Sequence, residues 1–227
     1  MLRLVLFGRQ GAGKGTQAVR MAEHYGAPHI STGDMLRAAV AEGSAIGQKV
    51  KAIIDAGQLV PDELMLEVIG ERFAQSDVAE HGFLLDGFPR TRPQAEALLS
   101  REPVDVAVDL RVPEALVHKR LSARRVCQKG HIFTATDPEA IDGICPEDGT
   151  LIVQRDDDTP AAIAALSKGE IARQAIAARL EDYLAKTVPA ILLFQEKGLL
   201  VEVDGVGSPD EVFGRVTAAV DAFLGGA

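Results

Sequence analysis

The sequence begins with a short apolar run that leads directly into a glycine-rich loop. Residues 2–7 read LRLVLF, and residues 8–16 read GRQGAGKGT before a stretch with helical character. Glycines let the backbone turn with positive φ and keep Cβ atoms away from a bound phosphate. The freed N–H groups then face an anion at the N-terminus of the next helix, and Lys14 adds a compact positive charge. This order of strand, glycine loop, lysine and helix predicts a phosphate-binding P-loop.

The loop departs from the common P-loop pattern at two places. Gly15 follows Lys14 where Ser or Thr is usual, with Thr16 next, and Arg9-Gln10 stands where proline is common. The GAG before the lysine and the GKGT ending resemble the nucleoside monophosphate kinases, and adenylate kinases in particular. The resemblance implies that Lys14 is catalytic. It also implies an ATP phosphate site made by Gly11, Ala12, Gly13, Lys14, Gly15 and Thr16.

Composition limits the function classes. The chain has 227 residues with 47% hydrophobic content, enough for one sizeable α/β core with small inserted subdomains. No apolar stretch approaches about 18 residues, and the opening strand runs straight into the loop, so neither a membrane span nor a signal peptide is expected. Two cysteines, a net charge of −9 and 4% aromatic content argue against a disulfide scaffold and against nucleic-acid binding. We therefore expect a cytoplasmic protein.

The next motif, STGDMLR at residues 31–37, opens a helical stretch. Taken alone, it is a capped helix with a solvated arginine. Its place after the P-loop helix resembles the start of the AMP-binding subdomain of adenylate kinases, which implies that Thr32 contacts adenine and Arg37 contacts the AMP phosphate. Further along, a segment resembling the family's adenine pocket comprises Gln58, Leu59 and Val60, for which the alternative is an ordinary turn before a helix over 62–75.

A third motif follows an apolar strand over 83–85 and reads DGFPRTRPQ. Asp86 ends that strand, at the sheet edge where parallel α/β proteins bind ligands, and its carboxylate can hold Mg²⁺ through water. The run is close to an adenylate kinase signature, which implies Arg90 on the AMP phosphate and Gln94 on adenine. A glutamine amide can pair with the amino group and a ring nitrogen of adenine at once. The remaining AMP-site residues implied are Gly87, Phe88 and Pro89.

Further arginines and a glycine complete the implied nucleotide sites. A strand over 104–112 precedes a helix that ends among arginines, and the resemblance implies that Arg120 and Arg124 bind the triphosphate. Arginines near a helix C-terminus are otherwise ordinary dipole partners. Arg155 matches a family arginine that can face both nucleotides, and Arg179 resembles the family's final AMP-binding arginine. With Arg90, Arg124 and Lys14 they form the implied catalytic set. Gly207, in the turn before a helix over 209–224, is either an adenine contact for ATP or a plain turn residue.

Residues 126–154 change character and predict a small inserted lid of short β pieces. The pattern Cys127-x3-His131-x13-Cys145-x2-Asp148 could hold a tetrahedral metal, with Glu147 as a competitor for the last position. Some adenylate kinase lids carry four Cys, or three Cys and Asp, and others use a metal-free polar quartet; reduced, packed cysteines are a third possibility. We favour structural Zn²⁺, with Fe²⁺ or Co²⁺ as alternatives, because a small insertion lacks its own core.

The sequence therefore predicts an α/β fold: a P-loop-type parallel sheet flanked by helices, with an AMP-binding helical insert and a β-rich lid. The expected core is 1–30, 61–122 and 159–227, the AMP insert 31–60 and the lid 123–158, with about a dozen inserted residues near 160–172. The activity implied is reversible transfer, MgATP + AMP to 2 ADP, by a monomer that binds ATP, AMP and ADP. The rivals are a kinase for UMP, CMP or GMP, and a P-loop switch without transfer activity.

Overall fold

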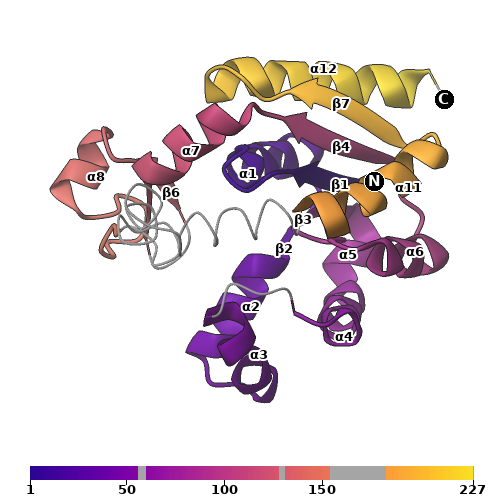
Figure 1. Ribbon diagram of the computed structural model, residues 1–227, viewed down its shortest axis with the longest axis horizontal. Coiled ribbons are helices and arrows are strands. Elements are labelled where there is room, and N and C mark those ends of the chain that lie inside the picture. Colours follow the sequence, from indigo (N-terminus) through magenta and orange to yellow (C-terminus); the bar gives the residue numbers. More distant parts are fainter. Residues whose placement is uncertain (56–59, 128–130, 154–182, 227) are drawn as a thin grey trace. The chain divides into compact units, whose positions relative to one another are not determined.

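The computed structural model describes residues 1–55, 60–127, 131–153 and 183–226 (Figure 1). The chain divides into two compact units. The first comprises Met1–Arg9, Gly13–Val112 and Asp182–Ala227; the second comprises Gln10–Ala12 and Pro113–Glu181. None of the helices in the described ranges is long and apolar enough to cross a membrane.

The first unit is built on a parallel sheet of five strands in the order β2-β3-β1-β4-β7. On β1, every residue from Leu4 to Gly8 is buried, which is typical of a parallel strand covered on both faces. Leu6 of β1 pairs with Asp86 of β3, and Ser31 of β2 pairs with the same residue, so the carboxyl ends of these strands meet at one edge. The strands are β1 Leu2–Gly8, β2 His29–Ser31, β3 Gly82–Asp86, β4 Val106–Arg111 and β7 Leu200–Asp204.

Pleating divides the buried side chains of β1 between two layers of helices. Val5 and Phe7 join the large core cluster, where the Phe7 ring meets Phe194 of α11 edge-on at 5.3 Å between centroids. Leu4 and Leu6 alternate with them and are also buried. The helices of this unit are α1 Lys14–Tyr25, α2 Thr32–Ala41, α3 Ala45–Asp55, α4 Asp62–Phe73, α5 Ser76–His81, α6 Arg92–Arg101, η2 Tyr183–Thr187, α11 Val188–Glu196 and α12 Pro209–Gly225.

The helical insert expected after the P-loop helix is present as α2 and α3, which pack closely together. Gly47 makes this contact possible, because a Cβ at that position would lie 2.0 Å from the Ala39 carbonyl oxygen. The same region contains Ser31 as the N-cap of α2, whose side chain accepts from the Asp34 N–H. The insert therefore starts at a capped helix, as the motif indicated.

The second unit contains a short antiparallel β-ribbon with a small core of its own. The strands β5 and β6 pair through Arg125 and Phe133, and a cluster of Cys127, Cys145 and Ile152 is buried beside them. The helix α8 in this region was not expected. The elements are α7 Glu114–Ala123, β5 Arg124–Val126, β6 Ile132–Thr134 and α8 Pro138–Asp142.

The fold class expected from the sequence is confirmed. The helix before the lid ends at Ala123, and Arg124 is both its C-cap and the first residue of β5, so this helix ends among arginines as expected. The helix α5 was missed, because its six residues are too few to show a helical period. Four expected site residues, Gln58, Leu59, Arg155 and Arg179, and the expected insertion near 160–172 lie outside the described residues.

Candidate functional site

Within the P-loop, Gly13 is the N-cap of α1, and its backbone lies in the left-handed region of φ and ψ. Gly13 has φ 97° and makes no side-chain cap, so the first N–H groups of α1 receive no hydrogen bond from that position. The Lys14 ammonium donates to the carbonyl oxygens of Gly8 and Arg9, at 2.8 and 3.2 Å. Gly15 and Thr16 follow in the first turn and are partly exposed. The loop therefore offers an open helix N-terminus with a cation beside it, which favours an anion.

The second unit holds the middle of the same loop against α7. Gly11 has φ 80°, and a Cβ there would lie 3.0 Å from Leu121 Cγ, so glycine meets both a conformational and a steric need. The Arg120 guanidinium donates to the Ala12 carbonyl oxygen at 3.0 Å. Burial lowers the pKa of Arg120 from its ordinary value. Of the two arginines expected at the triphosphate, Arg120 thus contacts the loop directly.

Asp86 lies at the carboxyl end of β3 beside a histidine that sequence reasoning missed. Its Oδ2 is 3.9 Å from His29 Nε2, and its side chain is 13% exposed. Burial acts to raise the pKa of Asp86, but His29 and the Lys14 charge outweigh burial and lower that pKa. The carboxylate is therefore ionised at neutral pH and suited to hold a metal-bound water. His29 could have been found only from the β2–β3 register, which places it two residues before Ser31 on the face of Asp86.

The carbonyl of Gly87 organises the start of the third motif. Its oxygen accepts from Thr32 Oγ1 at 3.0 Å and from Arg90 Nε at 2.8 Å. Gly87 has φ 83°, and a Cβ there would lie 2.9 Å from Thr32 Oγ1. Thr32 is 1% exposed, whereas Arg90 is exposed, so the carbonyl links a buried hydroxyl to a guanidinium at the surface. Phe88 and Pro89 between them are buried.

Gln94 is buried and held by protein groups at both ends of its amide. The Arg90 N–H donates to Gln94 Oε1 at 2.7 Å, and Gln94 Nε2 donates to Asp62 Oδ1 at 2.7 Å. Asp62 also accepts from Thr91 Oγ1 through Oδ2 at 2.9 Å. With 3% of its surface exposed, Gln94 is not the helix-surface residue of the alternative reading. Asp62 is a second residue that sequence reasoning missed, because it lies 32 positions earlier in the chain.

The structure also describes three further residues that were expected to contact nucleotides, which are Arg37, Val60 and Gly207. Arg37 is exposed and forms an ion pair with Asp34 on the first turn of α2. Val60 is buried in the large core cluster. Gly207 has φ 128°, and the carbonyl just before it, on Val206, accepts from Arg215.

A buried carboxylate on β4 was not expected. Asp109 is 1% exposed, lies 2.7 Å from Arg111 Nε, and accepts from the Tyr183 hydroxyl at 3.5 Å. Burial raises the pKa of Asp109 despite the Arg111 charge. The Arg9 guanidinium lies over the Tyr183 ring, 5.9 Å from its centroid. Tyr183 therefore lies between Asp109 and a residue at the beginning of the P-loop.

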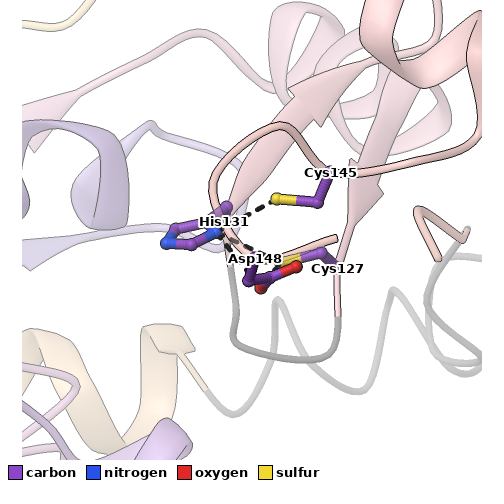
Figure 2. A group of neighbouring side chains, drawn as sticks. All are labelled: Cys127, His131, Cys145 and Asp148. Carbon is purple, nitrogen blue, oxygen red and sulfur yellow. Dashed lines mark hydrogen bonds and ion pairs between the residues drawn. The ribbon is translucent and has the colours of Figure 1, made fainter. Parts of the chain in front are cut away.

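In the second unit, the four expected metal ligands converge on one point (Figure 2). One ligand atom from each of these residues lies within 4.8 Å of the others. His131 Nδ1 is 3.3 Å from each cysteine Sγ and 3.4 Å from Asp148 Oδ2, and Cys127 Sγ is 3.1 Å from the same oxygen. Ligands on one zinc ion at ordinary bond lengths stand about 3.3 to 3.8 Å apart, so these residues fit a tetrahedral cation.

The Asp148 carboxylate is oriented by a neighbour that sequence reasoning did not identify. Its Oδ1 accepts from the Thr150 N–H at 2.8 Å and from the Thr150 hydroxyl at 2.5 Å. The other oxygen, Oδ2, faces Cys127 and His131. The Thr150 hydroxyl, more than any other group, holds the pKa of Asp148 well below its ordinary range, while burial raises the pKa of Cys145. Glu147, the competing acid, is exposed and outside the cluster.

The open N-terminus of α1 with Lys14, and the carboxylate of Asp86 on the neighbouring strand, define a P-loop nucleotide-binding protein of the α/β class. A family model described as adenylate kinase matches residues 6–199. The adenylate kinase of Thermodesulfovibrio yellowstonii is 45% identical over 227 residues, which cover 97% of this chain and 99% of the relative. Those of Streptomyces griseus and Methanococcoides burtonii are 42% and 41% identical, over 97% and 98% of this chain and 98% and 100% of the relatives.

The chain belongs to the adenylate kinase family. It is accordingly a nucleoside monophosphate kinase, a phosphotransferase that interconverts ATP and AMP with two ADP. The resemblance drawn from the sequence motifs is thereby confirmed.

Proposed function

We propose that this chain carries out adenylate kinase transfer with the residues of the three motifs, each in a separate role. The observation that carries this assignment is the arrangement around Asp86 and Gly87. The Lys14 charge helps to lower the pKa of Asp86, and the Gly87 carbonyl oxygen accepts hydrogen bonds from Thr32 and Arg90. One short segment therefore connects the groups assigned to ATP with those assigned to AMP.

On the ATP side, the loop N–H groups and Lys14 bind the phosphates, with Arg120 and Arg124 as further cations. The Arg120 bond to Ala12 supports its place beside the loop. Lys14 exchanges its bonds to the Gly8 and Arg9 carbonyls for bonds to phosphate oxygens. These fixed charges stabilise the transferring phosphoryl group without a covalent intermediate.

On the AMP side, Arg37 and Arg90 bind the phosphate, and Thr32, Val60 and Gln94 adjoin the adenine. Arg90 is exposed, and its Nε donates to the Gly87 carbonyl oxygen. This hydrogen bond restricts the orientation of the guanidinium group. Arg155 and Arg179, which lie outside the described residues, are proposed to complete the cationic set, with Gln58 and Leu59 in the base pocket and Gly207 near the adenine of ATP.

Adenylate kinases use Mg²⁺ with ATP, and Asp86 is the residue that would hold its water ligands here. The lowered pKa and partial exposure of Asp86 support this role. When bound, Mg²⁺ neutralises charge on the phosphates. The protein contributes a fixed, ionised carboxylate at the carboxyl end of β3.

The lid cluster is proposed to hold a structural Zn²⁺, with Fe²⁺ or Co²⁺ as alternatives. The convergence of Cys127, His131, Cys145 and Asp148, and the orientation of the carboxylate by Thr150, support this assignment. Four protein ligands leave no position for substrate, so the role is to stabilise the small core beside it.

An ADP-forming assay across acceptor monophosphates tests this function. With MgATP, AMP should be used far better than GMP, UMP or CMP, because a site with buried polar pairs rejects a base that leaves them unpaired. Gln94→Leu should raise the KM for AMP more than the KM for ATP. Equal rates with UMP and AMP would assign another acceptor, and ATP binding without transfer would favour a P-loop switch.

A further inference from the structure

The Gln94 amide has its two ends distinguished by partners that can act in only one way. A backbone N–H can only donate, and the Arg90 N–H is 2.7 Å from Gln94 Oε1. A carboxylate can only accept, and Asp62 Oδ1 is 2.7 Å from Gln94 Nε2. The positions of the amide oxygen and nitrogen therefore follow from the chemistry of their partners. Turning the amide over would place an NH₂ group against an N–H, and an oxygen against a carboxylate.

Asp62 is itself held in place. Its second oxygen accepts from Thr91 Oγ1 at 2.9 Å, and the same hydroxyl accepts from the Gln94 N–H at 3.3 Å as the N-cap of α6. The start of α4 is thus joined to the start of α6 through one carboxylate. Because Gln94 is 3% exposed, an amide turned against these partners would keep unsatisfied polar groups in a buried place.

The amide retains one donor and one acceptor position. Its oxygen has two lone pairs and its nitrogen two hydrogens, and the described residues use one of each. The remaining donor is on Nε2 and the remaining acceptor on Oε1, two adjacent atoms of one amide whose order is fixed by Asp62 and Arg90. This pair matches an adenine edge, which presents an amino group beside a ring nitrogen. A 6-oxopurine presents an oxygen where adenine has the amino group, so it would meet the fixed amide oxygen with another acceptor.

We propose that Asp62 is a specificity-determining positioning residue, which locks the orientation of the Gln94 amide and so selects 6-aminopurine over 6-oxopurine acceptors. The proposal rests on the assignment of Gln94 to adenine in the proposed function. Asp62 acts through Gln94 and does not itself touch the base. Its effect is therefore expected in the choice between acceptors and not in phosphate binding.

The test compares AMP with inosine monophosphate, which carries an oxygen at carbon 6 and a protonated ring N1 and is otherwise the same nucleotide. The wild-type protein should favour AMP by about 10³-fold or more in kcat/KM. In Asp62→Ala that preference should fall by about tenfold or more, because only the Arg90 N–H then orients the amide. Asp62→Asn should keep most of the preference, since its Oδ1 can accept the same bond.

Glu63→Ala is the matched control, because Glu63 is the other acid in the first turn of α4, is exposed, and is not among the hydrogen-bond partners of Gln94 in the described residues. It should leave the preference unchanged. An equal loss of kcat/KM for both acceptors in Asp62→Ala would make Asp62 a packing anchor and overturn the proposal. Wild-type protein that used both acceptors equally would overturn it as well.

A second readout works without turnover and separates this proposal from the proposed function. In nitrogen-15 NMR of the side-chain amides, one Gln94 N–H should be slow to exchange and shifted by its bond to Asp62. That signature should disappear in Asp62→Ala and persist in Glu63→Ala. Unchanged Gln94 amide signals in Asp62→Ala would contradict the lock even if AMP remained a good substrate. Absence of ADP formation with normal signals would contradict the proposed function alone.

Discussion

At the residue scale, Lys14 is the P-loop side chain that we propose places a full positive charge on the transferring phosphoryl group. Its ammonium donates to two loop carbonyls, which attract a cation less strongly than a phosphate anion does. Lys14→Met should lower turnover by about 10³-fold while the protein stays folded, as for the loss of a preorganised donor. Steady-state kinetics with circular dichroism as the folding control measure this. Turnover within a few-fold of wild type would contradict the assignment.

Asp109 allows a prediction about pH. Burial raises the pKa of Asp109 in the folded state, so above the ordinary carboxyl pKa the unfolded chain loses its proton first. The folded state then binds more protons, and its stability falls as pH rises through the raised pKa. The free energy of unfolding of the wild type, minus that of Asp109→Asn, should therefore decrease as the pH rises from the ordinary carboxyl pKa through the raised pKa of Asp109.

Denaturant unfolding of both proteins at several pH values gives this difference. The expected sign reflects desolvation of the carboxylate outweighing its 2.7 Å ion pair with Arg111. A difference that increases with pH would mean that the ion pair stabilises the charged form after all. Asp77→Asn serves as a comparison of opposite sign, because the bond from Arg72 lowers the pKa of Asp77.

At the element scale, the lid depends on very few buried side chains. Its core in the described residues consists of Cys127, Cys145 and Ile152, with Phe133 and Ala140 beside them. Such a core contributes little by burial, which is why a bound metal is expected to matter for stability. In the proposed function, by contrast, the charges that act on the phosphoryl group come from Lys14 and the arginines.

Metal removal should therefore lower the melting temperature more than it lowers turnover at low temperature. Protein purified without chelator should contain about one metal per chain, and Cys127→Ser and His131→Ala should lose it. Thr150→Val should weaken binding about 10- to 100-fold, because it removes a bond that orients Asp148. Glu147→Ala is the matched control and should behave as wild type. Elemental analysis without stoichiometric metal, and unchanged melting of both ligand variants, would indicate a metal-free lid.

The elements also show what sequence patterns can and cannot predict. The P-loop and the run from Asp86 to Gln94 are local, so their chemistry could be interpreted from neighbouring residues. His29, by contrast, approaches Asp86 only through the pairing of β2 with β3. Asp62 lies 29 positions from Thr91 and contacts it only because α4 and α6 start side by side. Positioning residues of this kind follow from tertiary packing, which no short motif encodes.

At the scale of the whole molecule, we propose that a single chain joins an ATP site to an AMP site and moves a phosphoryl group between them. The parallel sheet supplies the common edge, because Gly8, Ser31 and Asp86 end three adjacent strands there. Family membership supports the same reaction over nearly the whole length of the chain. Transfer between the two sites sets the stoichiometry of the reaction, which is two ADP for each ATP and AMP.

Phosphorus-31 NMR of the protein with equimolar ATP, AMP and Mg²⁺ tests it most directly. Two ADP should appear for each ATP and AMP consumed, and no inorganic phosphate should be released. ADP alone, at the same total nucleotide and phosphate, should reach the same final mixture. Lys14→Met should slow the approach to that mixture without changing it. Release of inorganic phosphate with AMP unchanged would show hydrolysis of ATP and would contradict phosphoryl transfer to AMP.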